Sequence, residues 1–340
     1  MGKDTDPSSN ALLDLIASQR ITAVIYVAAR LGVADLLAEG AKTPRELAQR
    51  TGAHERSLRR LLRALITIGI CKPVGTDQFA LTPVGAPLAS SAEPSLKVLA
   101  LFEGEMLWQS WGALLDSIRT GKNMAELAGI EDTFELMGRN PEAVRTFNQA
   151  MVALTRTITP GVLAAYDFSG IARLMDVGGG YGELLGAILN AYPSMRGVIF
   201  DLPRCADGAR EHLAAAGVGA RAEFIAGSFF ESVPSGADAI ILKSIIHDWD
   251  DERSIKILAN CHRALPQAGK LLLVERLMPE VPGTAAEDRA VTLSDLNMLR
   301  GPGGSERTRS EHEDVLRAAG FKLTRVLPAG RMSVIEATTR

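Results

Sequence analysis

The second half of this chain alternates between short apolar runs and helical stretches, and this alternation constrains the fold more than any other feature. From about residue 170 the runs are rich in Val, Ile and Leu. They are Leu174–Val177, Val198–Asp201, Glu223–Ala226, Ala237–Leu242 and Leu271–Glu275. Strands with nearly continuous apolar character are buried on both faces, so we predict an α/β fold, a doubly wound parallel sheet with helices on both sides.

Two further runs follow near the C-terminus, Phe321–Leu327 and Met332–Ala337, and only four residues join them. Parallel neighbours need a crossover of a dozen or more residues, which this link does not provide. The two runs must therefore pair antiparallel, and we predict that the sheet closes with a C-terminal hairpin.

The first half has helical periodicity instead, in Ala11–Leu37, Leu58–Ile68 and Trp108–Ile118. Thr43-Pro44-Arg45-Glu46 is a capping box with proline at the first helical position. Helix, turn, helix and hairpin follow one another up to Leu81, which is the order of a winged helix. At 340 residues two domains are expected. We divide the chain into a winged-helix-like domain (1–105), connecting helices (106–165) and a sheet domain (166–340).

A glycine-rich segment, DVGGGYG at 176–182, lies between the first predicted strand and a predicted helix. Glycines here permit a tight turn and let the backbone approach a ligand at the carboxyl edge of the sheet. A dinucleotide fingerprint needs a third glycine where this chain has Glu183, whose charge would repel a pyrophosphate. The spacing favours a cationic sulfonium cofactor without a phosphate. Asp201 ends the next strand, where a carboxylate can accept hydrogen bonds from both ribose hydroxyls.

A candidate base lies at the same sheet edge, in KSIIHDW at 243–249 after the fourth strand. Histidine is the side chain whose pKa suits proton removal near neutral pH, so we expect His247 to be a general base. Glu275 ends the fifth strand and Glu306 lies in GPGGSERT at 301–308. Either can accept a hydrogen bond from the imidazole and stabilise the imidazolium. The remaining histidines lie in charged helical contexts, and we assign them to solvated faces: His54, His212, His262 and His312.

Composition excludes several other classes. Three scattered cysteines without CxxC spacing argue against a disulfide framework and a structural zinc site. The net charge of -3 gives no general attraction to nucleic acid or an anionic membrane. The N-terminus lacks a signal-like apolar core, and the apolar tracts noted in the sheet domain are strand-length. We therefore expect a cytoplasmic protein without nucleic-acid or membrane partners.

Taken together, these segments resemble the small-molecule O-methyltransferases typified by plant caffeic acid and flavonoid enzymes, the hydroxyindole enzyme and bacterial enzymes of secondary metabolism. The resemblance covers nearly the whole chain. It depends on TPRELAQRTG, LRRLLRAL, FALTPVG, LMDVGGGYG, VIFDLP, LKSIIHDWDD, LVE and GPGGSERT in this order. It implies a Rossmann-like methyltransferase sheet with an antiparallel C-terminal hairpin and an N-terminal, mostly helical winged-helix dimerisation domain. In the family this domain forms a homodimer and contributes to the partner's acceptor pocket.

The resemblance also implies methyl transfer from S-adenosylmethionine to a hydroxyl of a small aromatic or polyketide-like acceptor, leaving S-adenosylhomocysteine and needing no metal. The expected cofactor contacts are Asp176, Gly178, Gly180, Asp201, Leu202, Ser228, Phe229 and Lys243. The expected acceptor contacts are Phe147, Met151, Asp248 and Met298. The family usually has an aspartate where this chain has Ser228; serine can still hydrogen-bond the adenine, and Phe229 can stack on it.

Two other functions fit parts of the sequence. The arginines of the second winged-helix helix suggest a DNA-binding regulator that senses the cofactor, although the acidic net charge and a hairpin without basic clusters argue against it: Arg56, Arg59, Arg60 and Arg63. A relative that keeps the cofactor but performs decarboxylation or hydroxylation is the other alternative. His247 and the two glutamates argue against that chemistry.

Overall fold

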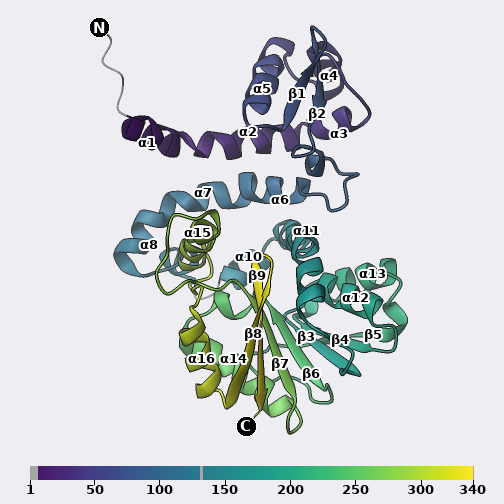
Figure 1. Ribbon diagram of the computed structural model, residues 1–340, viewed down its shortest axis with the longest axis vertical. Helices are drawn as coiled ribbons and strands as arrows, with labels where there is room; N and C mark the ends of the chain where they lie inside the picture. The colour runs from purple at the N-terminus through teal and green to yellow at the C-terminus, as the bar shows by residue number, and fades with distance from the viewer. Residues whose placement is uncertain (1–6, 131–132, 340) are drawn as a thin grey trace. The chain divides into compact units, whose positions relative to one another are not determined.

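The computed structural model describes residues 7–130 and 133–339, which form two compact units (Figure 1). The first unit runs through Gln109 and takes in Gln149–Ala153. The second unit holds Ser110–Asn148 and the chain from Leu154 onward. The long helix α11 (Pro141–Ala165) therefore belongs mostly to the second unit.

The first unit has its elements in winged-helix order. They are α1 (Pro7–Ala17), α2 (Gln19–Arg30), α3 (Val33–Ala38), α4 (Pro44–Thr51), α5 (Glu55–Thr67), β1 (Cys71–Val74), β2 (Gln78–Leu81), η1 (Ala86–Leu88), α6 (Lys97–Phe102) and η2 (Glu103–Leu107). The predicted capping box is confirmed, because the Thr43 hydroxyl accepts the Glu46 N–H and the Glu46 carboxylate accepts the Thr43 N–H. The predicted hairpin is also confirmed, with β1 and β2 antiparallel. Leu47, Leu58 and Leu62 are buried in a core of the unit's own.

The apolar segment Ala11–Leu37 is divided into three helices, with Gly32 in a left-handed conformation (φ 68°) before α3. Within it, Ser8–Arg30 has a mean hydropathy of 1.5 and is long and apolar enough to cross a membrane, by length and composition alone. We expected no membrane span because the apolar tracts of the sheet domain are only as long as strands. The segment Ser8–Arg30 is longer than those tracts. Only 6% of its apolar window is buried. An exposed apolar stripe of this kind marks an interaction surface.

The second unit is built on a seven-stranded sheet in the order β5-β4-β3-β6-β7-β9-β8 (Figure 1). The strands are β3 (Arg173–Val177), β4 (Arg196–Asp201), β5 (Ala222–Ala226), β6 (Ala239–Lys243), β7 (Lys270–Glu275), β8 (Phe321–Ala329) and β9 (Met332–Thr339). The first five are parallel, whereas β9 is antiparallel to both β7 and β8. The predicted sheet and its closing hairpin are confirmed.

Helices pack on both faces of this sheet, and successive side chains along a strand point alternately to one face and the other. Met175 and Val177 face a core with α14 (Asp251–Ala264) and α16 (Arg309–Ala318). Leu174 faces the opposite core, with α11 and the pair α12 (Glu183–Ala191) and α13 (Ala206–Ala215). The unit's remaining helices are α7 (Trp108–Ser110, which begins in the first unit), η3 (Trp111–Ala113), α8 (Leu114–Thr120), α9 (Met124–Leu127), α10 (Thr133–Gly138), η4 (Pro203–Cys205), η5 (Gly219–Arg221), η6 (Ile246–Asp248) and α15 (Ala286–Arg300).

The sheet positions a site where its strand order reverses. β3 lies between β4 and β6, and both neighbours are parallel to it. In open α/β sheets, ligands bind outside the carboxyl ends of the strands at such a switch point. The glycine segment follows β3 and His247 follows β6, so the two predicted halves of the site leave the sheet side by side.

Candidate active site

His247 lies on a tight turn after β6, which we call the His247 turn (Ser244–Trp249). Ser244 opens it with φ at 53°, and the 3₁₀ helix η6 follows. The first N–H groups of a helical turn have no partner within the turn. Here Glu275 Oε1 accepts the N–H groups of Ile245 and Ile246, both at 3.0 Å. The carboxylate at the end of β7 therefore fixes the start of the turn.

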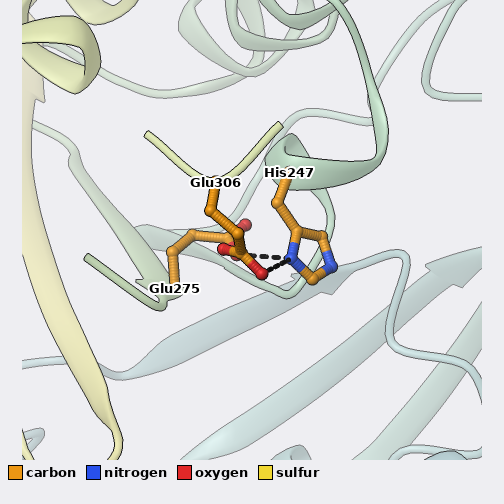
Figure 2. A group of neighbouring side chains, drawn as sticks. All are labelled: His247, Glu275 and Glu306. Carbon is orange, nitrogen blue, oxygen red and sulfur yellow. Dashed lines mark hydrogen bonds and ion pairs between the residues drawn. The ribbon is translucent and has the colours of Figure 1, made fainter. Parts of the chain in front are cut away.

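The imidazole of His247 contacts two glutamates through one nitrogen (Figure 2). Nδ1 lies 3.1 Å from Glu306 Oε1 and 3.7 Å from Glu275 Oε2. Ser294 on α15 donates its hydroxyl to the same Glu306 oxygen at 2.6 Å. Figure 2 shows both carboxylates on one side of the ring and Nε2 turned away from them. Nε2 instead lies 3.5 Å from Asp248 Oδ1.

The charges of this group shift several pKa values. Burial opposes protonation of His247, but Glu275, Asp248 and Glu306 outweigh it and raise its pKa to about 10. Burial, together with the charges of Glu275 and Glu306, raises the pKa of Asp248 to about 7. Burial also raises the pKa of Glu275, whereas the hydrogen bond and charge of His247 overcome burial and lower that of Glu306. His247 and Glu306 are therefore the ion pair of the group.

The glycine turn has the conformation that the sequence predicts. Gly178 and Gly180 have φ of 74° and 57°, in the left-handed region that favours glycine. Asp201 Oδ2 accepts the N–H of Gly180 at 2.7 Å, and Oδ1 accepts the N–H of Leu202 at 2.6 Å. Cys205 also hydrogen-bonds this carboxylate, whose two oxygens together have about four lone-pair sites, so it can still accept a ribose hydroxyl. These residues fit the ribose end of a nucleoside cofactor.

Two groups of opposite charge, Asp176 before the glycine turn and Lys243 before the His247 turn, influence each other's pKa. Burial raises the pKa of Asp176 to about 7, and Lys243 opposes that rise. Burial lowers the pKa of Lys243, whose Nζ donates to the Thr155 hydroxyl at 3.1 Å. Thr155 comes from α11 and is a site residue that the sequence pattern did not single out. A hydroxyl in a long apolar helix gives no periodic signal.

Phe229 lies next to the glycine turn. A Cβ on Gly178 would come within 2.5 Å of Ile245 Cδ1 and 3.6 Å of the Phe229 ring. The Ser228 hydroxyl accepts the N–H of Phe230 at 3.3 Å, so it closes its own loop. Trp249 packs edge-on against Phe229, with ring centroids 6.1 Å apart, and its indole N–H has no hydrogen-bond partner among the described residues.

The residues predicted to contact the acceptor are more scattered than those around the imidazole of His247. Asp248 lies beside the imidazole, as described above. The Phe147 ring packs against Phe134, and Phe134 packs against Trp249, at centroid distances of 6.1 and 5.6 Å. Met298 is buried on α15, and its carbonyl accepts the N–H of Gly303. Met151 belongs to the first unit, so its relation to this group stays a prediction.

The assignment of the other histidines to solvated faces is confirmed for His54, which is exposed, but it is wrong for His312, and His212 and His262 are half-buried. His312 is 1% exposed, and neither ring nitrogen has a hydrogen-bond partner among the described residues. His262 packs edge-on against Phe321. His212 Nε2 lies 2.8 Å from Glu183 Oε2, which also accepts Arg156 Nε at 3.0 Å. Charged neighbours in sequence did not predict burial, because α13, α14 and α16 each carry an apolar face inward.

His247, Glu275 and Glu306 also place three potential metal-ligand atoms within 4.8 Å of one another. Two of those groups are already engaged. Glu306 Oε1 accepts hydrogen bonds from His247 and Ser294, and Glu275 Oε1 accepts hydrogen bonds from two backbone N–H groups. The arrangement is that of a histidine whose tautomer and charge are controlled by carboxylates.

Comparison with known proteins gives matches over nearly the whole chain. The model of the O-methyltransferase domain matches residues 111–322, and that of the O-methyltransferase dimerisation domain matches residues 13–91. A phenazine O-methyltransferase of Lysobacter antibioticus is 41% identical over 97% of this chain and 96% of its own length. A mitomycin biosynthesis 6-O-methyltransferase of Streptomyces lavendulae is 38% identical over 90% and 87%. The crystal structure of human N-acetylserotonin methyltransferase with S-adenosylmethionine superposes with a TM-score of 0.92 at 26% identity, covering 100% and 99% of the two chains.

Proposed function

This chain belongs to the O-methyltransferase family and is an S-adenosylmethionine-dependent enzyme, and we propose that it methylates a phenolic hydroxyl of a small aromatic acceptor with His247 as the general base. The observation that carries this proposal is the orientation of the imidazole. Its Nδ1 is held by Glu306, and its Nε2 is turned away from both glutamates.

A comparison of the pKa of His247 with that of a phenol supports a phenolic acceptor. The carboxylates raise the pKa of His247 to about 10, which is close to the pKa of about 10 of a phenol such as tyrosine. Proton transfer between groups of matched pKa has little thermodynamic cost. In the neutral form of His247, which a pKa of about 10 makes the minor form at pH 7, Nε2 would take the hydroxyl proton. The resulting imidazolium would be stabilised by Glu306 through Nδ1–H.

The bound cofactor would supply an electrophilic methyl group on its sulfonium sulfur. The residues of the chain would orient it: Gly178 and Gly180 would let the backbone approach it, and Asp201 and the Leu202 segment would hold its ribose. Phe229 would stack on the adenine, with Ser228 beside it. Asp176, Lys243 and Thr155 would surround its amino-acid end.

The nature of the acceptor follows from the relatives. Phenazine and mitomycin are named for two of them, so a fused or substituted aromatic hydroxyl compound is the acceptor class that we propose. Phe147, Met151, Asp248 and Met298 are our candidates for its contacts. Aromatic rings around Trp249 would suit a planar compound.

We also propose a cytoplasmic homodimer formed through the first unit. The dimerisation model covers residues 13–91, and α1 leaves Leu12, Leu13, Leu15 and Ile16 more than half exposed. A second copy would cover this stripe. Arg59, one of the arginines that suggested DNA binding, pairs with Asp77 on the hairpin, which supports a structural role.

The test is His247→Ala, assayed with labelled S-adenosylmethionine and a panel of phenolic acceptors. We expect methyl transfer to fall by about 10²- to 10⁴-fold, the usual contribution of a general base, while cofactor affinity by calorimetry stays within twofold. His54→Ala is the matched control, because His54 is exposed in the first unit. Undiminished turnover in the His247 variant would refute the assigned base.

A further inference from the structure

Side chains from elsewhere in the fold hydrogen-bond the backbone of the His247 turn at both of its ends: to N–H groups at the start and to C=O groups at the end. Ser244 enters it in a left-handed conformation that non-glycine residues rarely adopt, and η6 has only three residues. Glu275 satisfies the N–H groups at the start. At the other end, Ile246 O accepts the N–H of Trp249 at 3.3 Å, and the Ser254 hydroxyl lies 3.3 Å from Ile246 O and 3.2 Å from Trp249 O. These contacts are long, and so short a helix supplies no second backbone donor to either carbonyl.

Arg307 makes the shortest hydrogen bonds to both carbonyls. Its Nη1 donates to Ile246 O at 2.9 Å, and its Nη2 donates to Trp249 O at 2.8 Å. The same guanidinium donates to Asp251 Oδ1 from Nε at 3.0 Å and from Nη2 at 2.8 Å. The side chain is 2% exposed. A planar guanidinium can bridge these groups in one fixed geometry, which a lysine ammonium cannot do.

The backbone before Arg307 lies directly on the His247 turn. A Cβ on Gly304 would come within 2.1 Å of His247 O and 2.4 Å of Trp249 N, so only glycine fits there. Two residues later, Glu306 contacts the imidazole at Nδ1. The segment Gly304–Arg307, which we call the clasp, therefore meets His247 at its backbone, its side chain and its flanking carbonyls.

We propose that Arg307 is a positioning residue for methyl transfer: it locks the His247 turn to the clasp, so that the imidazole stays aligned with Glu306. This inference rests on the proposed role of His247. Because Glu306 and Arg307 are consecutive, any slip of the turn against the clasp changes the Nδ1–Glu306 contact. A misplacement of about 1 Å can cost about 10²-fold in rate.

The test compares Arg307→Lys and Asp251→Ala with the control Glu252→Ala. Asp251 anchors the guanidinium, yet its side chain is 74% exposed, so its loss leaves the core intact. Glu252 is the neighbouring exposed acid in the same first turn of α14. We expect kcat to fall about 10²-fold in Arg307→Lys and roughly tenfold in Asp251→Ala, with wild-type kcat in the control. Cofactor affinity should stay within twofold in all three.

The pH profile separates positioning from a general loss of stability. If the imidazole leaves Glu306, its pKa falls, and the acid limb of kcat/KM moves to lower pH in both variants. A fall in kcat without that shift would overturn the inference, as would wild-type kcat in both variants.

The same changes in the His247→Ala background distinguish this inference from the proposed function. There Asp251→Ala should cause no further loss, because the base is already gone; a further loss would overturn the inference. Full turnover by His247→Ala alone would refute the base. A third outcome is that His247→Ala is inactive while the Arg307 and Asp251 variants keep the wild-type kcat and pH profile. That outcome would support His247 as the base and overturn the role proposed for Arg307.

Discussion

Glu306 Oε1 lies 3.1 Å from Nδ1 of His247, on the opposite side of the ring from the nitrogen that we propose takes the acceptor's proton. The carboxylate therefore controls the imidazole without occupying the place of the substrate. This relationship fixes which tautomer is present, because an ionised carboxylate accepts and does not donate. It also sets how strongly the ring holds a second proton.

Glu306→Gln should change both the pH dependence and the rate of methyl transfer. Removing the negative charge lowers the pKa of His247 from about 10, so the acid limb of kcat/KM moves to lower pH. The imidazolium is also less stabilised, so maximal kcat should fall by roughly 10- to 100-fold. A pH–rate series with initial velocities measures both effects, with Glu252→Gln as the control. An unshifted limb would contradict the ion pair.

Asp176 should make cofactor binding depend on pH near neutrality. Its pKa is raised to about 7, so the carboxylate is ionised at pH 8 and protonated at pH 6. A cationic sulfonium is favoured by the ionised form, so Kd for S-adenosylmethionine should rise as pH falls, by at most about tenfold per unit for one proton. Calorimetry at several pH values measures this. Asp176→Asn should bind more weakly at pH 8 and lose the dependence; a flat wild-type profile would count against the prediction.

Gly178→Ala should weaken cofactor binding. Its φ of 74° is strained for alanine by about 1–2 kcal/mol, and the new Cβ would come within 2.5 Å of Ile245 Cδ1. We expect Kd for the cofactor to rise about tenfold and Tm to fall. Gly170→Ala is the matched control, since a Cβ there meets nothing within 4 Å and φ is not positive. Equal behaviour of the two variants would show that the turn tolerates a side chain.

His312 should make the fold sensitive to mild acid. Burial and the charge of Arg307 lower its pKa to about 4, so below its ordinary 6.5 the unfolded chain binds a proton that the folded chain refuses. Stability should therefore fall between pH 6.5 and 4, by about 3 kcal/mol in total.

Replacement of His312 by leucine should remove that dependence and leave stability near pH 7 unchanged or higher, because both ring nitrogens lack partners among the described residues. Urea unfolding at pH 7 and pH 5 tests this, with the exposed His54→Gln as control. The prediction fails if His312→Leu keeps the wild-type slope.

Chelation of metal ions should leave turnover unchanged. The three potential ligand groups around His247 are held by hydrogen bonds within the protein, with Glu306 Oε1 serving both Nδ1 and the Ser294 hydroxyl. An assay in excess EDTA, against an untreated sample, is sufficient. Activity lost to the chelator and restored by one divalent ion would mean that the group ligates a metal.

Much of the fold could be predicted because its signals are local. The runs that became β3 to β9, the capping box at Thr43 and the short link before Met332 each determine one element or one pairing. His247 and Glu275 could also be brought together in advance, because each lies at the carboxyl end of a predicted parallel strand, and such ends share one edge of a sheet. Glu306 lies in the segment between α15 and α16, and the family resemblance indicated its place beside them.

The other contacts depend on packing that no local pattern records. Thr155 reaches Lys243 from the middle of a 25-residue helix, and His312 is buried on a helix rich in charged residues. Arg307 lies 61 positions from the Ile246 carbonyl to which it donates. Which side chain of α11 or α16 faces inward depends on how those helices lie on the sheet. The division of Ala11–Leu37 at Gly32 likewise depends on a single left-handed residue.

Asp176 is paired in register with Ile241 across β3 and β6, although 65 positions separate them. The glycine turn and the His247 turn, which we propose hold the methyl donor and the base, thus leave the sheet side by side because of one strand pairing. Loops from α12 to β5 could lengthen, shorten or gain a subdomain while the chemistry kept its geometry. A slip of β6 by one residue, about 3.3 Å, would by contrast move each of its side chains to the opposite face of the sheet and displace the His247 turn from the glycine turn. Evolutionary freedom in this scaffold therefore lies in the connections between strands, and its rigidity lies in the neighbouring strands β3, β6 and β7.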